Sequence, residues 1–531
     1  LNNTDFHTDR LFGLWVSPDL HEPARNAPYL LQGGLDLPDR EYYLSESPQM
    51  NDIRAKYARH VAAILRLAGR PDPNAAARGI VDLETRMARV HATRLESLEV
   101  RSADNPWKRT EFATRAPGLD WNVFFAAAGL GEAPVIVAWH ARAITGLSAL
   151  VTSEPLETWK NWMTFHAIDR RAGALPPSFM SEWFAFHGRT LSGTPQLAER
   201  WKRAVGATNA ALGEAVGRLY VEHHFSPDTK AQVRALVANV VAAFGKRIER
   251  LDWMSPATKA RAKEKLSTLY VGVGYPERWT DYSGLEVVRG DALGNAERAE
   301  LFEYRRRLAL LRAPTDKTEW WMTPQTVNAV NLPLQNALNF PAAILQPPSF
   351  DPAAPAAVNY GNIGATIGHE ISHSFDDQGA LFDASGRLAN WWSAEDLARF
   401  EGAGARLAAQ YDQYAPFPDL HVNGKQTLSE NIADLAGLAA AYDAWHASLG
   451  GARPPDVNGF TGEQQFFISY AQSWRSKERL EALRQQIITD GHAPDEYRAE
   501  TIRNLDAWYD AFGVTPGQRL FLAPPDRVRV W

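Results

Sequence analysis

The segment Gly361–Trp392 contains at its centre the sequence His369-Glu370-Ile371-Ser372-His373, an H-E-x-x-H pattern. In a helix, histidines at positions i and i+4 lie on one face, one turn apart, and both can bind a single Zn²⁺ ion. Glu370 lies about 100° around the helix from His369, so its carboxylate can reach a water molecule beside the metal without binding the metal itself. The pattern predicts a zinc-binding helix.

The residues around this motif also indicate a helix. Apolar side chains recur every four residues and form one stripe, made by Ile363, Ile367, Ile371 and Phe375. His369 lies two positions, about 200°, from Ile367, so the histidines face away from the stripe, as a pair lining a cleft would. Gly364, Gly368 and Ser372 leave another side thin, so we expect a neighbouring element to pack closely there.

The motif alone is not specific, because a chain with 14 histidines contains H-E-x-x-H by chance about one time in fifty. A catalytic zinc usually has three protein ligands and one position left for water. A second predicted helix supplies candidates, since Glu430 and Asp434 lie at i and i+4 with Gly437 beside them. They face away from an apolar stripe formed by Leu428, Ile432, Leu435, Ala439 and Tyr442.

A second interpretation of this helix involves no chemistry. Thr427 and Glu430 form the capping-box pattern T-x-x-E, which begins many helices. Beside two histidines that lack only one carboxylate ligand, we favour Glu430 as the third ligand. Asp434 would then be a carboxylate that orients a ligand histidine.

The composition excludes several classes of protein and of site. The chain has 531 residues, 45% of them hydrophobic and 22% charged, which predicts a soluble globular protein of two large lobes. A net charge of −6 argues against a general surface for nucleic acid or anionic membrane. Without cysteine, any metal must use histidine and carboxylate ligands. No apolar run approaches the length of about 18 residues expected for a membrane span.

Patterns along the chain predict a mainly α protein with a smaller β part, of the α+β class. We expect helices from Met50 to about 68, around 80–90, and over 121–153, 155–168, 197–224, 228–251 and 256–268. After about residue 270 extended patterns appear, at 270–273, 325–330 and 339–348, and Asn423-Gly424 is a hairpin signal. We therefore predict a mostly helical lobe over residues 1–270 and a second lobe over 271–531.

The order of several motifs resembles the neprilysin family of zinc metallopeptidases, which includes the endothelin-converting enzymes and bacterial oligopeptidases. The motifs are Val327-Asn328-Ala329, Phe340–Pro348, Gly368–Asp377, Glu430–Leu435, Gly459–Gln464 and Ala471–Trp474, with Gly34–Leu44 and Arg529–Trp531 also similar. The resemblance covers nearly the whole chain. It implies a thermolysin-like zincin catalytic lobe and a large α-helical capping lobe, which encloses the active site and admits only peptides of limited size.

The resemblance also implies the chemistry of the site. It suggests one zinc ion per chain, with His369, His373 and Glu430 similar to the zinc ligands. Glu370 resembles the general base that activates the zinc-bound water. Asp434 resembles the carboxylate that orients a ligand histidine.

The remaining roles implied by the resemblance concern the substrate. Asn328 and Ala329 are similar to the edge segment that hydrogen-bonds the substrate backbone. His492 is similar to the histidine that steadies the oxyanion, and Arg498 to the arginine that binds a substrate carbonyl. Two further side chains resemble walls of the apolar pocket after the scissile bond, Ile344 and Trp474. Without the resemblance, His492 would be only a loop histidine and Arg498 an ordinary helix charge.

The chain also departs from the family pattern. Val330 and Asn331 stand where aromatic residues are usual, and Ser349 stands where a pocket aromatic is common, so the substrate preference is less defined than the chemistry. The family's leading segment is absent before Leu1, so we expect either a fragment or a separate chain that completes the fold. The missing cysteine pairs are closer to bacterial relatives, for which an extracytoplasmic location is typical.

Together these observations predict a zinc endopeptidase that hydrolyses oligopeptides on the amino side of apolar residues. The alternative from another class is a catalytically silent peptide-binding or scaffold protein with the same fold. An exopeptidase is a second variant within the enzyme class.

Overall fold

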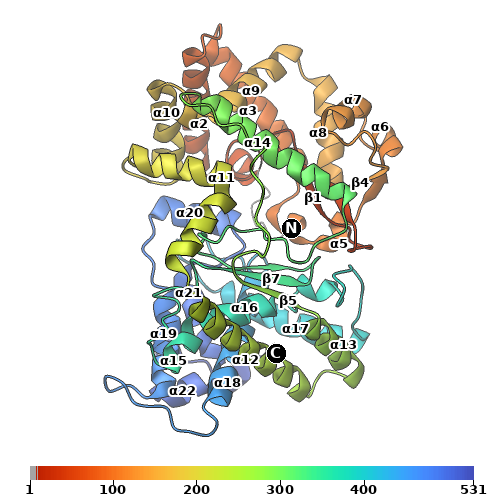
Figure 1. Cartoon of the computed structure of the whole chain (residues 1–531). Helices are drawn as coiled ribbons and strands as arrows, with labels where there is room; N and C mark the ends of the chain where they lie inside the picture. Colours follow the sequence, from red (N-terminus) through yellow and green to blue (C-terminus); the bar gives the residue numbers. More distant parts are fainter. Residues whose placement is uncertain (1–7, 9) are drawn as a thin grey trace.

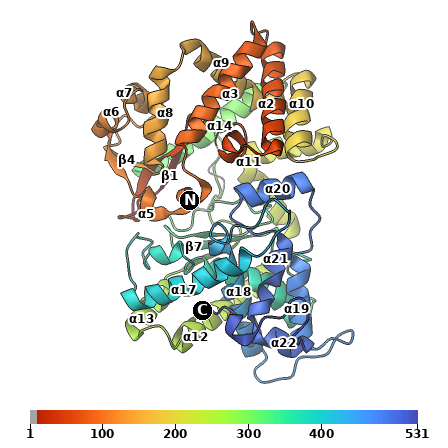
Figure 2. The ribbon, with the colours of Figure 1, turned by 180° about the vertical axis from the view of Figure 1, so that it is seen from behind.

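Two large apolar clusters organise the chain, and each forms the core of one lobe. The computed structural model describes residue 8 and residues 10–531. Buried side chains between Phe12 and Leu191 form the core of the first lobe, and buried side chains between Phe225 and Trp531 form that of the second. Figures 1 and 2 show the lobes stacked, with the first lobe above.

The first lobe is mostly helical and carries one small sheet. Its longer helices are α2 (Pro48–Leu67), α3 (Pro73–Val90), α8 (Ala141–Ser153), α9 (Leu156–Asp169) and α10 (Pro177–Trp183), with a π-helical segment η3 (Phe184–Leu191). The four-stranded sheet has the order β1-β2-β4-β3, with β1 at Phe12–Pro18, β2 at Asn26–Gln32, β3 at Pro106–Lys108 and β4 at Val135–Ala138. Only β2 and β4 are parallel.

The prediction of one helix over 121–153 is wrong. The segment forms helix α7 (Trp121–Ala127), then strand β4, then α8. Its middle, Val135-Ile136-Val137-Ala138, is a short apolar run whose periodicity fits a buried strand as well as a helix. Three of these four side chains are buried in the sheet, and β-branched residues favour that conformation.

The second lobe combines helices with a three-stranded sheet of order β5-β7-β6. Its strands are β5 (Tyr270–Gly274), β6 (Val330–Leu332) and β7 (Ala337–Pro341). Its helices are α12 (Pro227–Arg250), α13 (Pro256–Ser267), α15 (Ala356–Asn359), α16 (Ala365–Ser372), α17 (Ala394–Tyr411), α18 (Leu428–Ser448), α19 (Gly462–Ser473), α20 (Leu480–Thr489), α21 (Asp495–Ala499) and α22 (Asp506–Phe512).

Two extended predictions in this lobe have different outcomes. The strand at 270–273 is confirmed as β5. The hairpin at Asn423-Gly424 is wrong, because residues 421–427 are all described and contain a turn but no strand. The Asn423 side chain instead accepts hydrogen bonds from the backbone N–H groups of Lys425 and Gln426, which forms the turn that leads into α18.

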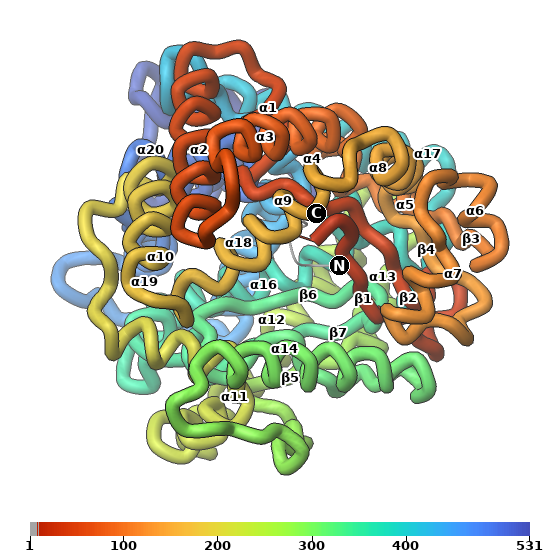
Figure 3. The backbone as a smooth tube through the Cα atoms, turned by 90° about the horizontal axis from the view of Figure 1, so that it is seen from above, coloured from red at the N-terminus to blue at the C-terminus, as the bar shows by residue number. Residues whose placement is uncertain are grey.

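The two cores do not divide the chain at residue 270. Helices α12 and α13, which the sequence placed in the first lobe, pack in the core of the second. Helix α11 (Arg200–His224) descends between the lobes, whereas α14 (Ala292–Ala309) returns to the first lobe, where Leu308 packs on its core (Figure 1). Seen from above, α11 and α14 lie at the same edge of the molecule (Figure 3). The apolar stripe of a helix predicts that one face is buried, but it does not indicate which of the two cores that face contacts.

Helices α16 and α18 of the second lobe pack backbone against backbone. A Cβ atom placed on Gly368 would lie 2.4 Å from the carbonyl oxygen of Gly437, and one on Gly437 would lie 2.2 Å from the backbone nitrogen of His369. The two backbones are therefore in direct contact, as the thin side of the motif helix predicts. This contact brings the start of α18 beside the histidines.

Replacing Gly437 by alanine tests this contact. We expect Gly437→Ala to lower the free energy of unfolding by at least about 1–3 kcal/mol and to lower zinc affinity, because the new methyl group forces the helices apart. Urea denaturation and zinc titration measure the two effects.

The matched control is Gly402→Ala in α17, where an added Cβ meets nothing within 4 Å. Alanine there should leave zinc affinity unchanged and stabilise the helix by up to about 1 kcal/mol. Equal effects of the two substitutions would contradict the close contact.

Candidate metal centre and active site

The motif helix positions its histidines as the sequence predicts. Helix α15, a π-helical turn η5 (Tyr360–Gly364) and α16 follow one another without a break. The four residues of the apolar stripe, Ile363, Ile367, Ile371 and Phe375, have no exposed surface. His373 follows the last residue of α16 and keeps helical backbone angles. The histidines therefore stay one turn apart on the opposite face.

Three side chains converge on one point beside this helix. The Nε2 atoms of His369 and His373 are 2.9 Å apart. The Oε2 atom of Glu430 lies 3.2 Å from Nε2 of His369 and 3.6 Å from Nε2 of His373. His369 and Glu430 are 61 positions apart in the sequence. They come together in space because helix α16 packs against helix α18.

The outer nitrogen of each histidine determines its tautomer. Nδ1 of His369 lies 2.8 Å from a carboxylate oxygen of Asp434, and Nδ1 of His373 lies 2.6 Å from one of Asp376. Because a carboxylate only accepts, each Nδ1 carries a hydrogen, and in the neutral rings each Nε2 then directs a lone pair inward. Two lone pairs and a carboxylate oxygen at one point repel each other unless a cation lies between them. The site fits the His₂Glu ligand set of a catalytic zinc.

Glu430 is available for this site because it takes no part in a cap. The Thr427 side chain accepts no hydrogen bond from the helix backbone; its hydroxyl donates to the carbonyl oxygen of Asn423 and accepts from the side chain of Asn431. The capping-box interpretation of Thr427 and Glu430 is therefore wrong. The nearby histidines hold the pKa of Glu430 well below its usual range despite its burial.

Glu370 is placed as a proton acceptor rather than as a ligand. Its carboxylate is buried, and Oε2 has no hydrogen-bond partner among the described residues. Burial raises the pKa of Glu370 above its ordinary value, which suits a general base at neutral pH. Its backbone carbonyl accepts a hydrogen bond of 2.7 Å from the Asn331 side chain, which also donates to Ser374. Strand β6 is thereby tied to the motif helix.

His492 and Arg498 reach the same centre from the segment around α21. Nε2 of His492 lies 3.1 Å from Oε2 of Glu430, and its Nδ1 lies 2.6 Å from Asp490. Burial disfavours the imidazolium form of His492, but these two carboxylates outweigh it and raise its pKa to about 9. Arg498 binds both oxygens of Asp434, at 2.8 and 2.9 Å.

The predicted substrate residues have mainly local contacts. Trp474 lies under the guanidinium of Arg498, at 4.1 Å from the ring centre. Asn328 is exposed just before β6, and its side chain accepts a hydrogen bond from the backbone N–H of Ala329, which is buried. Ile344 is partly buried against the core of the second lobe.

Three residues of the site were missed by the sequence analysis. Asp376 follows His373 by three positions, a spacing that could have indicated a carboxylate one turn further along. Asp490 precedes His492 by two positions and also accepts the backbone N–H of His492. Asn331 was noted only as a departure from the family; it is 1% exposed and carried no signal for its contact with the motif helix.

Comparison with known proteins identifies the family. One model of peptidase family M13, for its amino-terminal part, matches residues 2–276, and a second matches residues 328–528. The chain belongs to peptidase family M13. The endothelin-converting enzyme-like 1 protein of Rattus norvegicus is 33% identical over 532 residues, covering 97% of this chain and 67% of that protein. The resemblance to the neprilysin family is thus confirmed.

Two solved structures are similar to this M13 peptidase. The Mycobacterium tuberculosis zinc metalloprotease ZMP1 in complex with an inhibitor has a TM-score of 0.94 and 40% identity, covering 98% of this chain and 80% of that one. PepO from Lactobacillus rhamnosis has a TM-score of 0.89 and 33% identity, covering 99% and 83%. This M13 peptidase is a zinc metallopeptidase with the two-lobed α+β fold of its family.

Two further predictions concern partners. No described helix of this M13 peptidase has the length and apolar character needed to cross a membrane. The comparisons give no support to a separate chain that supplies a leading segment.

The carboxylates behind the two histidines can be tested through zinc affinity. We expect Asp434→Asn and Asp376→Asn each to weaken zinc binding by about 10–100-fold, because the amide no longer holds the histidine Nδ1–H in place. Competition with a chromophoric chelator measures the dissociation constant.

Glu395→Gln serves as the control, since Glu395 is 76% exposed and pairs only with Arg399 among the described residues. Its zinc affinity should equal that of the unmodified protein. If both aspartate variants also keep that affinity, the carboxylates do not orient the ligands.

Proposed function

We propose that this M13 peptidase is a zinc endopeptidase that hydrolyses oligopeptides on the amino side of apolar residues. One observation carries the proposal. The buried carboxylate of Glu370, whose Oε2 is unpartnered among the described residues, follows His369 directly, and His369 converges with His373 and Glu430. A carboxylate in that position, beside a ligand set with an open place, is what peptide hydrolysis by an activated water requires.

The protein's residues divide the proton transfers between them. His369, His373 and Glu430 would hold the zinc ion, which would lower the pKa of a bound water toward about 7 and polarise the peptide carbonyl. Glu370 accepts the proton of the attacking water and then delivers it to the nitrogen of the leaving amine. Its raised pKa favours both steps, because the carboxyl must gain a proton and release it again near neutral pH.

His492 is proposed to stabilise the charge that develops on the substrate. Its Nε2 points to the ligand oxygen of Glu430, and Asp490 accepts from its Nδ1, so the ring can donate towards the space at the centre. A hydrogen bond to the carbonyl oxygen becomes stronger as that oxygen gains negative charge. Arg498, whose position is determined by its paired hydrogen bonds to Asp434, is proposed to bind a second substrate carbonyl.

The substrate is proposed to lie along strand β6. This strand pairs with β7 on one side and forms the edge of its sheet, so an extended peptide can add to it by backbone hydrogen bonds. Asn328 and Ala329 lie at the entry of this edge, and Ile344 and Trp474 are the proposed pocket walls. Because Asn331 is buried and bonded to the motif helix, its departure from the family pattern concerns the scaffold rather than the pocket.

Glu370→Gln tests the general base. We expect turnover of a quenched fluorogenic peptide to fall by at least about 100–10,000-fold, because glutamine cannot accept the proton. Zinc content, measured by inductively coupled plasma mass spectrometry, should stay unchanged because Glu370 is not a ligand. Glu395→Gln is the matched control and should keep full turnover. Full activity in Glu370→Gln would refute the mechanism.

Cleavage of a mixed peptide library tests the type of reaction and its specificity. Mass spectrometry should find internal cuts before apolar residues, and a zinc chelator should abolish them. Peptides blocked at both ends should still be cut, whereas an exopeptidase would leave them intact. Bound zinc with peptide retention and no cleavage would instead favour the silent peptide-binding alternative.

A further inference from the structure

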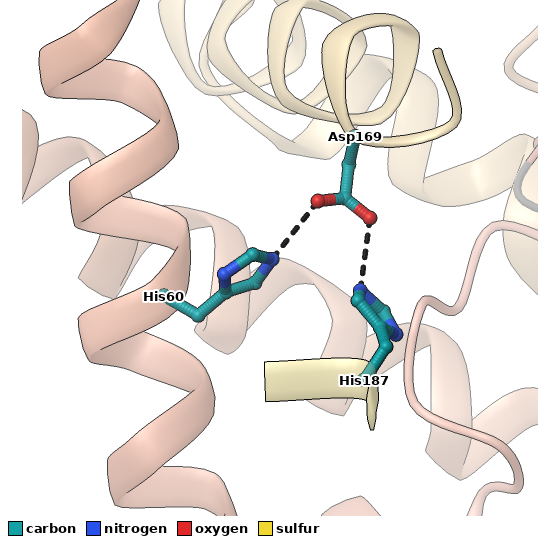
Figure 4. Close-up of side chains that lie close together, drawn as sticks. All are labelled: His60, Asp169 and His187. Carbon is teal, nitrogen blue, oxygen red and sulfur yellow. Dashed lines mark hydrogen bonds and ion pairs between the residues drawn. The ribbon is translucent and has the colours of Figure 1, made fainter. Parts of the chain in front are cut away.

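A second cluster of metal-binding residue types lies in the first lobe. His60 of α2, Asp169 at the end of α9 and His187 of η3 point towards one another (Figure 4). Nε2 of His60 lies 2.9 Å from Oδ1 of Asp169, and Nε2 of His187 lies 2.9 Å from Oδ2 of Asp169. The side chains of His60, Asp169 and His187 are only 1%, 4% and 17% exposed.

The two imidazole rings are held in these positions by their surroundings. The His60 ring stacks on Phe186 at 4.9 Å and 13°, and its Nδ1 lies 3.2 Å from a carboxylate oxygen of Glu182. The His187 ring stacks on Trp183 at 4.9 Å and 21°. A carboxylate behind a histidine, like Glu182 behind His60, is typical of metal sites, where it directs the other ring nitrogen to the ion.

Asp36 provides an independent observation at the same place. Its side chain lies in the segment after β2 and is 9% exposed, and Oδ2 is 3.7 Å from Nε2 of His187. That oxygen is buried and has no hydrogen-bond partner among the described residues. A buried carboxylate oxygen without a partner is costly, and such groups are rare in folded proteins.

We propose that His60, Asp169, His187 and Asp36 bind a second divalent metal ion, Zn²⁺ or a similar transition metal, in the first lobe. Ligands about 2.0–2.1 Å from a tetrahedral zinc are about 3.3 Å from one another. The separations of 2.9, 2.9 and 3.7 Å lie around this value. Imidazole and carboxylate ligands together suit zinc and its neighbours, and the ion supplies the missing partner of Asp36.

The ion can reach this site, and it would join distant parts of the lobe. Asp36, Asp169 and His187 line a cavity of about 2200 Å³, which gives access. The four ligands come from the segment after β2, from α2, from α9 and from η3, so one ion cross-links four elements. Segment η3 also contacts α20, which leads to Asp490 behind His492. The second ion thus stabilises the lobe on the side that meets the catalytic centre.

A metal-free arrangement is the competing explanation. Asp169 would accept a hydrogen bond from each imidazole, and His60, with a carboxylate at both ring nitrogens, would be an imidazolium. This accounts for the three residues of Figure 4, but it leaves Oδ2 of Asp36 without a hydrogen-bond partner among the described residues. The two explanations differ in the number of metal ions that the chain binds.

Counting metal ions in the full-length chain separates them. After saturation with Zn²⁺ and removal of unbound ions, plasma mass spectrometry should find two ions per unmodified chain. The double variant His369→Ala/His373→Ala should retain one, and adding His187→Ala should reduce it to none. His223→Ala, an exposed histidine outside both clusters, is the control and should leave the double variant with one.

A second measurement follows the thermal stability of the double variant, whose four proposed first-lobe ligands are unchanged. Zn²⁺ added to the metal-free double variant should raise its melting temperature, because an ion that binds only the folded state stabilises it. Asp36→Asn, which preserves size, should reduce the shift. One ion in the unmodified chain, with none bound and no thermal shift in the double variant, would overturn the second site and leave the proposed peptidase intact. No ion in the unmodified chain would overturn both.

Discussion

The direct contact between the backbones of α16 and α18 is the constraint on which the catalytic centre depends. Gly368 and Gly437 meet where any side chain would collide with backbone atoms of the other helix. Because the helices approach this closely, Glu430 comes within 3.2 Å of His369, and Asp434 reaches the far nitrogen of the same ring. The ligand set is therefore a consequence of two glycines that touch no metal themselves.

Charge balance explains which charged residues surround the three candidate metal ligands. Arg498 pairs with Asp434, which bonds His369; Asp490 bonds His492, which faces Glu430. A buried carboxylate is costly unless it is paired, so each negative group is matched by a donor. Glu370 differs from these carboxylates, since its Oε2 has neither a hydrogen bond nor an ion pair among the described residues. A group that must take and release a proton cannot be satisfied permanently by a neighbour.

Each lobe contains a cluster of histidines and carboxylates with a carboxylate oxygen beside it that has no hydrogen-bond partner among the described residues. In the second lobe, histidines and carboxylates converge and leave Glu370 unsatisfied; in the first, they converge and leave Asp36 unsatisfied. The buried ammonium group of Lys265 shows the opposite case, since it donates to the carbonyl oxygens of Gly379 and Phe382 and so holds the chain that follows the motif helix. Lys265 thus supports the scaffold, whereas Glu370 and Asp36 each lie beside a cluster of histidines and carboxylates that can hold a metal ion.

The sequence by itself determined the elements whose signal is local. The i, i+4 spacing of His369 and His373, the apolar stripe behind them and the thin glycine side predicted the motif helix, because helix geometry relates nearby residues directly. The tertiary structure alone decided which helices belong to which core, that 121–153 contains a strand, and that Asp490 and Asn331 join the centre. It alone brought His60 together with Asp36, Asp169 and His187. These contacts join positions far apart in the chain or depend on the end of a helix, where the spacing no longer specifies a direction.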